Sequence, residues 1–556
     1  MTRRIVRTLL QVSTAATFTF FIIFLLDRNF RVLPNAIHEY LPTHHHGSVI
    51  TDITVAKCSS LNIFSSCKVA DGSGKWTRIE KDLLLKKGFV SSAFLHVQRK
   101  KEEELKEGED KVVVDVWVGR LDPSKSKDIK DDGEDGKWEQ RSGGLWVKRS
   151  SKKGVSDSKA AVTAVDVLFG DDAVEARPGW VMRGGTKLLL DGGRSSIPGA
   201  HITIRRGAPQ EVVKPQLRVN DNGRFKIMQL ADLHLSNGVG HCRDALPEDW
   251  NGGKCEADPR TLEFVEKMLD EEKPDLVVLS GDQVNGDTAP DAQTAIFKYA
   301  ERLIKRKIPY VSIFGNHDDE GSLSRSAQME LIETLPYSLS KAGPVDIDGV
   351  GNYYVEVLAK GGSGHSAITV YLLDTHAYSP NEKKYKGYDW LKKNQIEWFR
   401  NTARSLKKAH KEYTKHHMDV AFIHIPIPEY RDENLVLYKE WKEPSTAPMY
   451  NSGFYDALVE EGVSMVSCGH DHVNEYCGLS KDPETEKPLL WMCYAGGTGF
   501  GGYAGYGGFH RKIRIFDFNM NEARITTWKR VEFGEDANNK RVEELIIVDG
   551  GKPVVP

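Results

Sequence analysis

The sequence lacks an excess of charge of either sign. Its 556 residues include 76 basic and 79 acidic side chains, which gives a formal net charge of −3 at pH 7. Proteins that bind nucleic acid or another polyanion usually carry a basic excess, so we expect no nucleic-acid partner. The sequence also contains no Asn-x-Ser/Thr site for N-glycosylation, so glycosylation gives no information about the compartment.

Cysteine is scarce, with seven residues in the chain. Two pairs, Cys58/Cys67 and Cys242/Cys255, are closely spaced in loop-like sequence. In an oxidising compartment both pairs can form disulfides, whereas in the cytosol all four side chains stay free thiols. The sequence is compatible with either state.

Long apolar runs are also rare, but the uncharged run Leu9–Leu26 is an exception. Its 18 residues are about the shortest length that crosses a bilayer as a helix. Arg3, Arg4 and Arg7 precede it, which favours a cytosolic N-terminus and translocation of the rest of the chain. Because no small-x-small cleavage site follows, residues 1–31 are predicted to be a cytosolic tip and an uncleaved signal anchor.

This anchor predicts a single-pass membrane protein of the endomembrane system, whose main part is lumenal or extracellular. The membrane is then a partner of the N-terminal helix. A secreted or a cytoplasmic protein is the alternative.

Residues 50–220 predict a small β-rich module. Short apolar runs are separated by Gly, Asp and Lys, and Ser124–Lys137 is predicted to be a mobile loop. This segment contains no recognisable group of catalytic side chains, so we assign it an accessory role. The predicted strands are Val112–Val118, Leu145–Val147, Ala164–Phe169, Trp180–Met182, Lys187–Leu190 and His201–Ile204.

Between residues 224 and 530 the sequence alternates between strand-like and helix-like segments. Strand patterns such as Leu276–Leu279 are followed by helix patterns such as Ala292–Lys305. This alternation predicts an α/β domain with a largely parallel sheet, in which ligands bind at the carboxyl ends of the strands. Residues 531–556 are predicted to be a C-terminal tail.

Metal-binding side chains follow five of the predicted strands. Alternate residues of a strand point to the same side, so the two side chains of an Asp-x-His at a strand end can bind one metal ion. A single such ending is usually a turn or capping feature, but a series of them in one domain favours a metal site. Oxygen and nitrogen ligands together suit first-row divalent metals. The five endings are Asp232-Leu233-His234, Gly281-Asp282-Gln283-Val284-Asn285, Gly315-Asn316-His317-Asp318, His424-Ile425-Pro426 and Gly469-His470-Asp471-His472.

This series of motifs (DxH, GDxx(N), GNHD, HxP and GHxH) resembles the calcineurin-like metallophosphoesterase superfamily over about residues 224–530. Segments between the motifs, such as Cys242–Asp258 and His424–Tyr430, resemble one branch of it. That fungal and plant branch includes purple-acid-phosphatase-29-like enzymes and the fungal dosage-dependent cell-cycle regulator phosphatases. The resemblance implies an αββα sandwich, preceded here by the β-rich module and the transmembrane anchor.

The resemblance also implies a pair of metal ions. Two divalent ions or a mixed-valence pair are expected, and manganese, iron and zinc all fit the ligand types. One ion is expected on Asp232, His234 and His472, the other on Asn316, His424 and His470, with Asp282 bridging the two.

His317 resembles the histidine of the family that is not a metal ligand and that donates a proton to the leaving oxygen or binds phosphate. Many members orient this histidine with an aspartate where this chain has Asn285. An amide accepts a hydrogen bond but cannot stabilise imidazolium with a full charge, so we expect a lower pKa for His317 than in those members. Purple members have tyrosine at this position, so no tyrosinate-to-iron absorption is expected.

Four side chains are weaker candidates for substrate binding. His241 and Arg243 follow the first motif, and Asp374 and His376 end another strand on the same rim. The glycine-rich segment Tyr494–Gly508 can cradle phosphate through its backbone, although loop packing is the more common role of such segments.

These features predict a metal-dependent phosphoric ester hydrolase in which metal-bound hydroxide attacks a phosphate monoester, on a phosphoprotein or a small phosphoester. A phosphodiesterase on the same metal core is the alternative enzyme. A non-catalytic binding protein with the same fold is the alternative outside enzymes, and near-zero turnover of metal-loaded protein would identify it.

Overall fold

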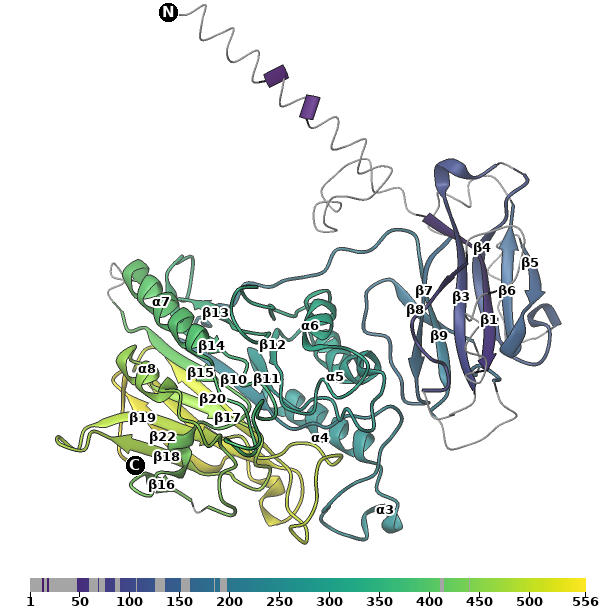
Figure 1. The fold of residues 1–556 in the computed structure, drawn as a ribbon. Coiled ribbons are helices and arrows are strands. Elements are labelled where there is room, and N and C mark those ends of the chain that lie inside the picture. Colours follow the sequence, from purple (N-terminus) through teal and green to yellow (C-terminus); the bar gives the residue numbers. More distant parts are fainter. Residues whose placement is uncertain are drawn as a thin grey trace, which may run out of the picture.

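The structure is a computed structural model of the full chain. It describes residues 13–14, 18–19, 48–59, 69, 76–85, 91–106, 108–125, 136–151, 161–184, 186–190, 198–410, 415–439 and 441–556. Figure 1 shows a large α/β domain and, beside its helices α5 and α6, a smaller module built of strands.

The first sheet of the large domain has seven strands in the order β12-β11-β10-β20-β21-β22-β23. Strands β10, β11 and β12 are parallel, and β20 pairs with β10 in the antiparallel direction. Their bounds are β10 (Arg224–Leu230), β11 (Leu276–Ser280), β12 (Tyr310–Ile313), β20 (Lys512–Asn519), β21 (Arg524–Val531), β22 (Val542–Asp549) and β23 (Lys552–Pro553).

The second sheet also has seven strands, in the order β13-β14-β15-β17-β19-β18-β16. Strands β14, β15, β17 and β19 are parallel. The bounds are β13 (Tyr353–Leu358), β14 (Ser366–Leu372), β15 (Met418–Phe422), β16 (Val436–Tyr438), β17 (Met465–Cys468), β18 (Cys477–Lys481) and β19 (Pro488–Tyr494).

Alternation along the strands creates the layers. In β10, Met228 and Leu230 pack against the helices on the outer face of the first sheet, whereas Phe225 and Ile227 face the second sheet. The outer face of the second sheet packs against two further helices. The result is the predicted αββα sandwich. Its main helices are α4 (Ala257–Glu272), α5 (Ala292–Arg306) and α6 (Arg325–Glu333) on the first sheet, and α7 (Lys393–His410) and α8 (Phe454–Glu460) on the second.

The predicted C-terminal tail is wrong, because residues 531–556 contain two strands of the first sheet, β22 and β23. Strand β22 pairs with β21 along most of its length, and β23 pairs with β22. Leu545, Ile547 and Val548 lie in the core between the two sheets. Part of this segment is therefore buried in the sandwich rather than solvated.

The N-terminal module is β-rich, as predicted, and contains three sheets of three strands. The predicted strand Lys187–Leu190 is absent from this part of the structure, because Leu188 and Leu189 donate only single hydrogen bonds, to Ala200 and Gly143, and form no ladder. The predicted mobile loop lies mainly outside the described residues. The strands are β1 (Ser48–Ser59), β2 (Trp76–Arg78), β3 (Ser91–Lys101), β4 (Val112–Val118), β5 (Lys137–Gln140), β6 (Leu145–Ser150), β7 (Val162–Phe169), β8 (Trp180–Arg183) and β9 (Ala200–Arg206).

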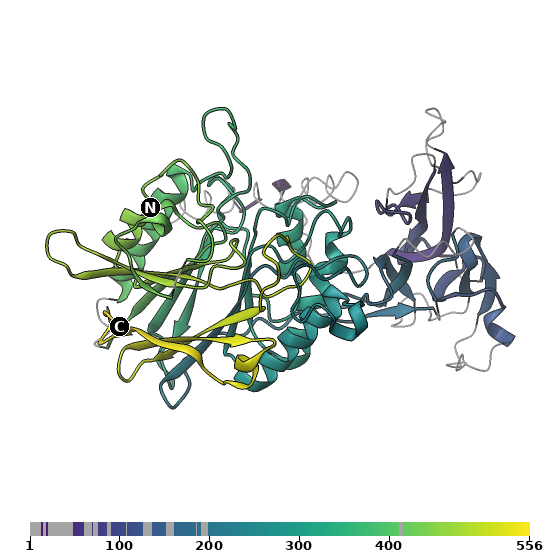
Figure 2. The ribbon, with the colours of Figure 1, turned by 90° about the horizontal axis from the view of Figure 1, so that it is seen from below.

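The module is fastened to helix α5 by polar contacts. Gln293 donates to Asp166 of β7 at 2.7 Å, and the backbone N–H of Phe169 donates to Thr294 Oγ1 at 3.1 Å. Lys298, which is fully buried, forms an ion pair with Asp172 at 2.6 Å. Figure 2 shows the module at the end of the molecule next to these helices.

Two disulfides lie in the large domain. Cys242–Cys255, one of the two pairs that the sequence left open, forms a disulfide, and Cys477–Cys493 joins directly opposed residues of β18 and β19. The sequence spacing did not suggest the second pair. The other candidate pair, Cys58/Cys67, includes Cys67, which lies outside the described residues.

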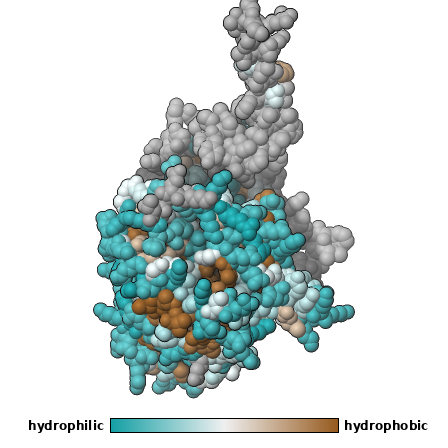
Figure 3. Space-filling view, turned by 90° about the vertical axis from the view of Figure 1, so that its left-hand side faces the viewer, coloured by the Kyte–Doolittle hydropathy of each residue, from teal (hydrophilic) through white to brown (hydrophobic). Residues whose placement is uncertain are grey.

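None of the helices in the described part of the chain is long and apolar enough to cross a membrane. Most of the predicted anchor Leu9–Leu26 lies outside the described residues. Figure 3 views the side of the molecule that carries β16, β18 and α8, and shows a mostly hydrophilic surface with small hydrophobic patches.

Candidate metal centre

The five predicted strand ends meet at one edge of the sandwich. The carboxyl ends of parallel strands share one edge of a sheet, so each sheet contributes several loops to the site. Strands β10, β11 and β12 lead into the first three motifs, and β15 and β17 lead into the last two. The fold thereby brings together His234 and His472, which are 238 residues apart in the chain.

Asp232, His234 and His472 form a first group that can hold a metal ion. Their ligand atoms all lie within 4.8 Å of one another, and all three side chains are buried. The Nε2 atoms of His234 and His472 are 3.0 Å apart, and His472 Nε2 is 3.4 Å from Asp232 Oδ1. These atoms converge on one point, as the ligands of one ion must.

Asp282, His424 and His470 form a second buried group of the same kind. His424 Nδ1 donates to the Ser280 carbonyl at 2.9 Å, which leaves Nε2 free to bind a metal. Asp282 Oδ2 is 3.2 Å from that Nε2 and 3.7 Å from Nε2 of His234 in the first group. Asp282 therefore lies between the two groups, in the position of a bridging carboxylate.

Several ligand atoms have no hydrogen-bond partner within the part of the chain that the structure describes. They are Nε2 of His424, Nε2 of His470 and Oδ1 of Asn316, all of them buried. Buried polar atoms are normally paired, because an unpaired one loses its hydration without compensation. The Asn316 amide nitrogen donates to Tyr378 Oη at 3.4 Å, so its oxygen remains for a cation. The residues therefore fit a pair of metal ions.

The protonation states of three histidines and of Asp282 suit metal binding. Burial lowers the pKa of His234 to about 3 and the pKa values of His470 and His472 well below their usual range, so these imidazoles are neutral at pH 7. Burial alone would raise the pKa of Asp282, but attraction to His424 outweighs burial and holds the pKa well below its usual range. Neutral imidazole and ionised carboxylate are the forms that bind metals.

The backbone of the site is strained. Asp232, His234, Asp282 and His470 have φ angles of 58°, 47°, 54° and 76°, in the left-handed region that side chains other than glycine rarely adopt. Backbone hydrogen bonds maintain this conformation. The N–H of Asp232 donates to the Gly281 carbonyl at 3.0 Å, and the N–H of His234 donates to the Asp282 carbonyl at 2.9 Å. Such strain concentrates at functional sites, where the surrounding structure maintains it.

Comparison with known proteins agrees with this geometry. Residues 225–474 match the family described as calcineurin-like phosphoesterase. The chain is 34% identical over 348 residues to "Probable inactive purple acid phosphatase 29" of Arabidopsis thaliana, an alignment that covers 58% of this chain and 86% of that protein. The chain belongs to the calcineurin-like phosphoesterase family.

Two fungal proteins are also similar to this chain. It is 40% identical over 391 residues to "Phosphatase DCR2" of Saccharomyces cerevisiae, and this alignment covers 67% of this chain. The alignment covers 65% of DCR2, which is less than two thirds of the length of the yeast protein. It is 30% identical over 492 residues to "Uncharacterized protein C1020.05" of Schizosaccharomyces pombe, covering 87% of each. That alignment is longer than the segment from residue 224 to the end, so it includes part of the N-terminal module.

The structure gives His317 a different partner from the predicted one. Its Nδ1 lies 2.9 Å from Glu320 Oε2, whereas the Asn285 amide donates to the Gly501 carbonyl at 3.0 Å. Burial lowers the pKa of His317, but the carboxylates of Asp282 and Glu320 outweigh burial and raise the pKa above its usual value. The argument for a low pKa, which rested on Asn285 as the partner, therefore does not apply.

Asp374 and the backbone of His376 belong to a network of hydrogen bonds beside the metal-ligand loops. Asp374 is fully buried and accepts hydrogen bonds from Arg325 and from the backbone of His376 and Val350. Arg325 also donates to the Gly315 carbonyl at 2.7 Å. This network supports the loop that carries Asn316 and His317, and substrate contact by Asp374 or His376 stays a prediction.

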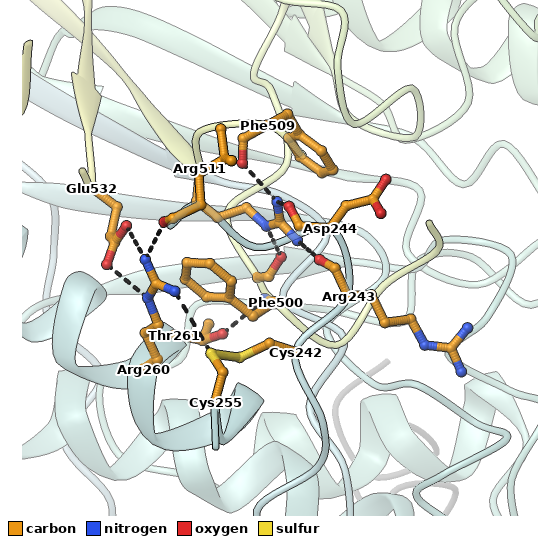
Figure 4. Close-up of a disulfide and its surroundings, with 12 residues drawn as sticks. Cys242, Arg243, Asp244, Cys255, Arg260, Thr261, Phe500, Phe509, Arg511 and Glu532 are labelled. Atoms are coloured by element: carbon orange, nitrogen blue, oxygen red, sulfur yellow. Dashed lines mark hydrogen bonds and ion pairs between the residues drawn. A yellow bond between two sulfur atoms is a disulfide. The ribbon is translucent and has the colours of Figure 1, made fainter. Parts of the chain in front are cut away.

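His241 and Arg243 lie on the exposed loop that the Cys242–Cys255 disulfide closes. In Figure 4 the Arg243 guanidinium points away from the cluster in which Arg260 and Arg511 stack on Phe500. The backbone of Arg243 joins this cluster, because its N–H donates to the Phe500 carbonyl at 2.8 Å. Substrate contact by His241 or Arg243 stays a prediction.

Two residues of the site were not assigned a role from the sequence. Asp318 accepts hydrogen bonds from the backbone N–H groups of Asp282, Val284 and Gly315 at 2.6 to 2.9 Å, and so joins two of the motif loops. The place of Asp318 in the GNHD motif could have indicated that it belongs to the site. Tyr503 stacks on His472 with ring centroids 3.8 Å apart, and its Oη accepts from the His472 N–H at 2.7 Å. Only its position in the glycine-rich segment pointed to it.

Proposed function

We propose that this protein is a phosphatase that uses two metal ions to hydrolyse phosphate monoesters, on a phosphoprotein or on a small molecule. The observation that carries the proposal is the pair of buried ligand groups that share Asp282 and contain unpaired ligand atoms. A structural role does not account for these atoms, because leaving them buried and unpaired costs free energy.

A bound metal pair would activate water as a nucleophile and offset the negative charge that develops on the phosphoryl oxygens. The first ion would be held by Asp232, His234 and His472, the second by Asn316, His424 and His470, and Asp282 would contact both. Manganese, iron and zinc all suit these nitrogen and oxygen ligands. His317, whose side chain is 29% exposed, can meet a substrate at the solvent side of this centre.

A non-catalytic role is the second candidate, and the names of the Arabidopsis relatives favour considering it. These proteins are described as probable inactive purple acid phosphatases. In this chain, the complete set of ligand types and the histidine beside them support catalysis instead. A phosphodiesterase on the same centre is the third candidate.

The test is hydrolysis of p-nitrophenyl phosphate and bis(p-nitrophenyl) phosphate by the full chain, with manganese, zinc or iron added and bound metal measured. Asp282→Asn removes the charge of the shared carboxylate with little change in size, and Asp549→Asn, on the exposed end of β22, is the matched control. We expect metal-dependent monoester hydrolysis that Asp282→Asn reduces by at least about 100-fold and that the control retains.

Each alternative has its own outcome in this experiment. A higher rate on the diester would identify a phosphodiesterase. Two bound metal ions without turnover of either substrate would identify a binding protein, and protein that binds no metal would refute the site itself.

We also propose that the large domain lies in the lumen or outside the cell. The disulfides Cys242–Cys255 and Cys477–Cys493 support this proposal, because such bonds persist in oxidising compartments. Protease protection of the domain in sealed microsomes would test it, and digestion without detergent would contradict a lumenal domain.

A further inference from the structure

His317 stands at the boundary between the metal centre and solvent. Its backbone N–H donates to Asp282 Oδ1 at 2.8 Å, and its ring lies beside that of His234, with centroids 5.4 Å apart. The side chains of Asp282 and His234 are each 2% exposed, whereas that of His317 is 29% exposed. His317 is therefore the imidazole that a substrate bound at the centre would meet first.

Glu320 contacts the Nδ1 atom of this imidazole. Oε2 of Glu320 lies 2.9 Å from His317 Nδ1, and Oε1 accepts a hydrogen bond from Tyr378 Oη at 3.2 Å. The carboxylate is thus fixed from two sides. Backbone packing adds to this, because a Cβ at Gly286 would lie only 2.4 Å from Cβ of Glu320.

Asn285 is engaged elsewhere. Its side-chain amide donates to the Gly501 carbonyl at 3.0 Å, and its backbone N–H donates to Leu235 at 3.0 Å. Both contacts tie Asn285 to the wall of the site. The carboxylate that contacts His317 Nδ1 comes instead from position 320, three residues after the histidine.

We propose that Glu320 is the positioning residue for His317 in phosphate-ester cleavage, an inference that rests on the proposed function. A carboxylate on Nδ1 selects the orientation of the ring and directs Nε2 toward the reacting group. Tyr378 donates a hydrogen bond to the Glu320 carboxylate and so helps to position it.

The step that this geometry serves is proton transfer to the leaving group. As the bond between phosphorus and the leaving oxygen breaks, its electron pair stays on that oxygen, which takes the proton from His317 Nε2 and leaves as an alcohol. Water supplies the oxygen that forms the new bond to phosphorus and releases a proton to solvent. The imidazole ends neutral, with its Nδ1 proton still shared with Glu320, and solvent returns the proton to Nε2.

The experiment compares two monoesters that differ in their need for a proton. The leaving group of phenyl phosphate is strongly basic and needs protonation, whereas that of p-nitrophenyl phosphate departs readily as an anion. We expect Glu320→Ala to lower kcat for phenyl phosphate by at least about 10-fold, a part of the roughly 100- to 10,000-fold that a general acid contributes. The kcat for p-nitrophenyl phosphate should change by less than about 3-fold, since that reaction has little need of the acid.

A double variant tests whether Glu320 acts through His317. If it does, His317→Asn/Glu320→Ala should be no slower on phenyl phosphate than His317→Asn alone, because the second change removes an effect already lost. Asn285→Ala tests the competing partner, and Glu330→Ala, an exposed glutamate on α6, is the matched control. Both should keep the wild-type ratio of the two rates.

Equal losses on both substrates, additive losses in the double variant, or a changed ratio in Asn285→Ala instead of Glu320→Ala would overturn the inference. The proposed function fails separately, when wild-type protein loaded with metal hydrolyses neither substrate. In that case the inference falls with it, whereas an active wild type with unaffected Glu320→Ala refutes the inference alone.

Discussion

Replacing Gly502 by alanine should damage one of the two metal-ligand groups and spare the other. A Cβ at this position would lie 2.3 Å from Cε1 of His472 and 3.0 Å from Cδ2 of His234, two residues of the first group. Ordinary contacts of a Cβ begin near 3.4 Å. Gly502 has no left-handed φ angle, so the effect of alanine would be steric rather than conformational.

The size of the effect follows from this overlap. The His472 ring would have to move by about 1 Å, whereas metal–ligand distances tolerate about 0.2 Å. Misoriented ligands typically cost about 10- to 100-fold in metal affinity or activity, and we expect at least that loss at the first group. The three heavy atoms nearest to this Cβ all belong to His472 and His234, so the second group should keep its affinity for metal.

Calorimetric metal titration and metal analysis would measure this change. We expect the number of tightly bound ions to fall from two to one in Gly502→Ala, together with kcat. Gly364→Ala is the control, because a Cβ there meets nothing within 4 Å and the φ angle is ordinary. Two ions bound by Gly502→Ala with wild-type affinity would refute the assignment of His234 and His472 to one site.

Three further predictions concern stability. Lys298 is fully buried and pairs with Asp258 at 2.7 Å. Lys298→Met should therefore lower the free energy of unfolding in urea by about 3–5 kcal/mol. A loss below about 1 kcal/mol would show that this ion pair contributes little to stability. Burial raises the pKa of Asp166, but Lys81 and Arg177 outweigh burial and lower it to about 2 from an ordinary value of 3.8. Asp166 therefore stabilises the fold above pH 4 and loses this effect as the pH falls toward 2, so Asp166→Asn should cost about 2 kcal/mol at pH 7 and progressively less toward pH 2 in urea titrations. A pH-independent cost would show that the charge of Asp166 is not involved. Cys242→Ser/Cys255→Ser opens a short loop and should lower the free energy of unfolding by about 3 kcal/mol, seen as a lower melting temperature; an unchanged melting temperature would mean that the loop is held without the bond.

Local sequence was sufficient for the elements of the sandwich and for the residues at its strand ends. Apolar strands alternate with amphipathic helices over most of residues 224–530, and this periodicity identifies elements that bury one or both faces. The last two strands were missed. Val542–Asp549 has an irregular apolar pattern, and its pairing with β21 is what buries it.

The site shows the same division. Asp232 and His234 were predictable as neighbours, because two residues apart at a strand end is a local relation. The partner of His317, which is Glu320 and not Asn285, was not predictable from the sequence. It depends on the directions of side chains in two loops that follow neighbouring strands. Likewise, Cys477 and Cys493 pair because the β18–β19 register sets them opposite each other.

The sequence by itself determined which residue types stand at each strand end and the order in which they occur, since both are properties of short segments. Tertiary structure decided how those ends combine. Asp282 contacts both ligand groups, and His472 meets His234, only because two separate sheets pack face to face with their parallel strands ending at one edge. Contacts between segments more than 200 residues apart depend on the packing of the whole domain, which no local pattern encodes.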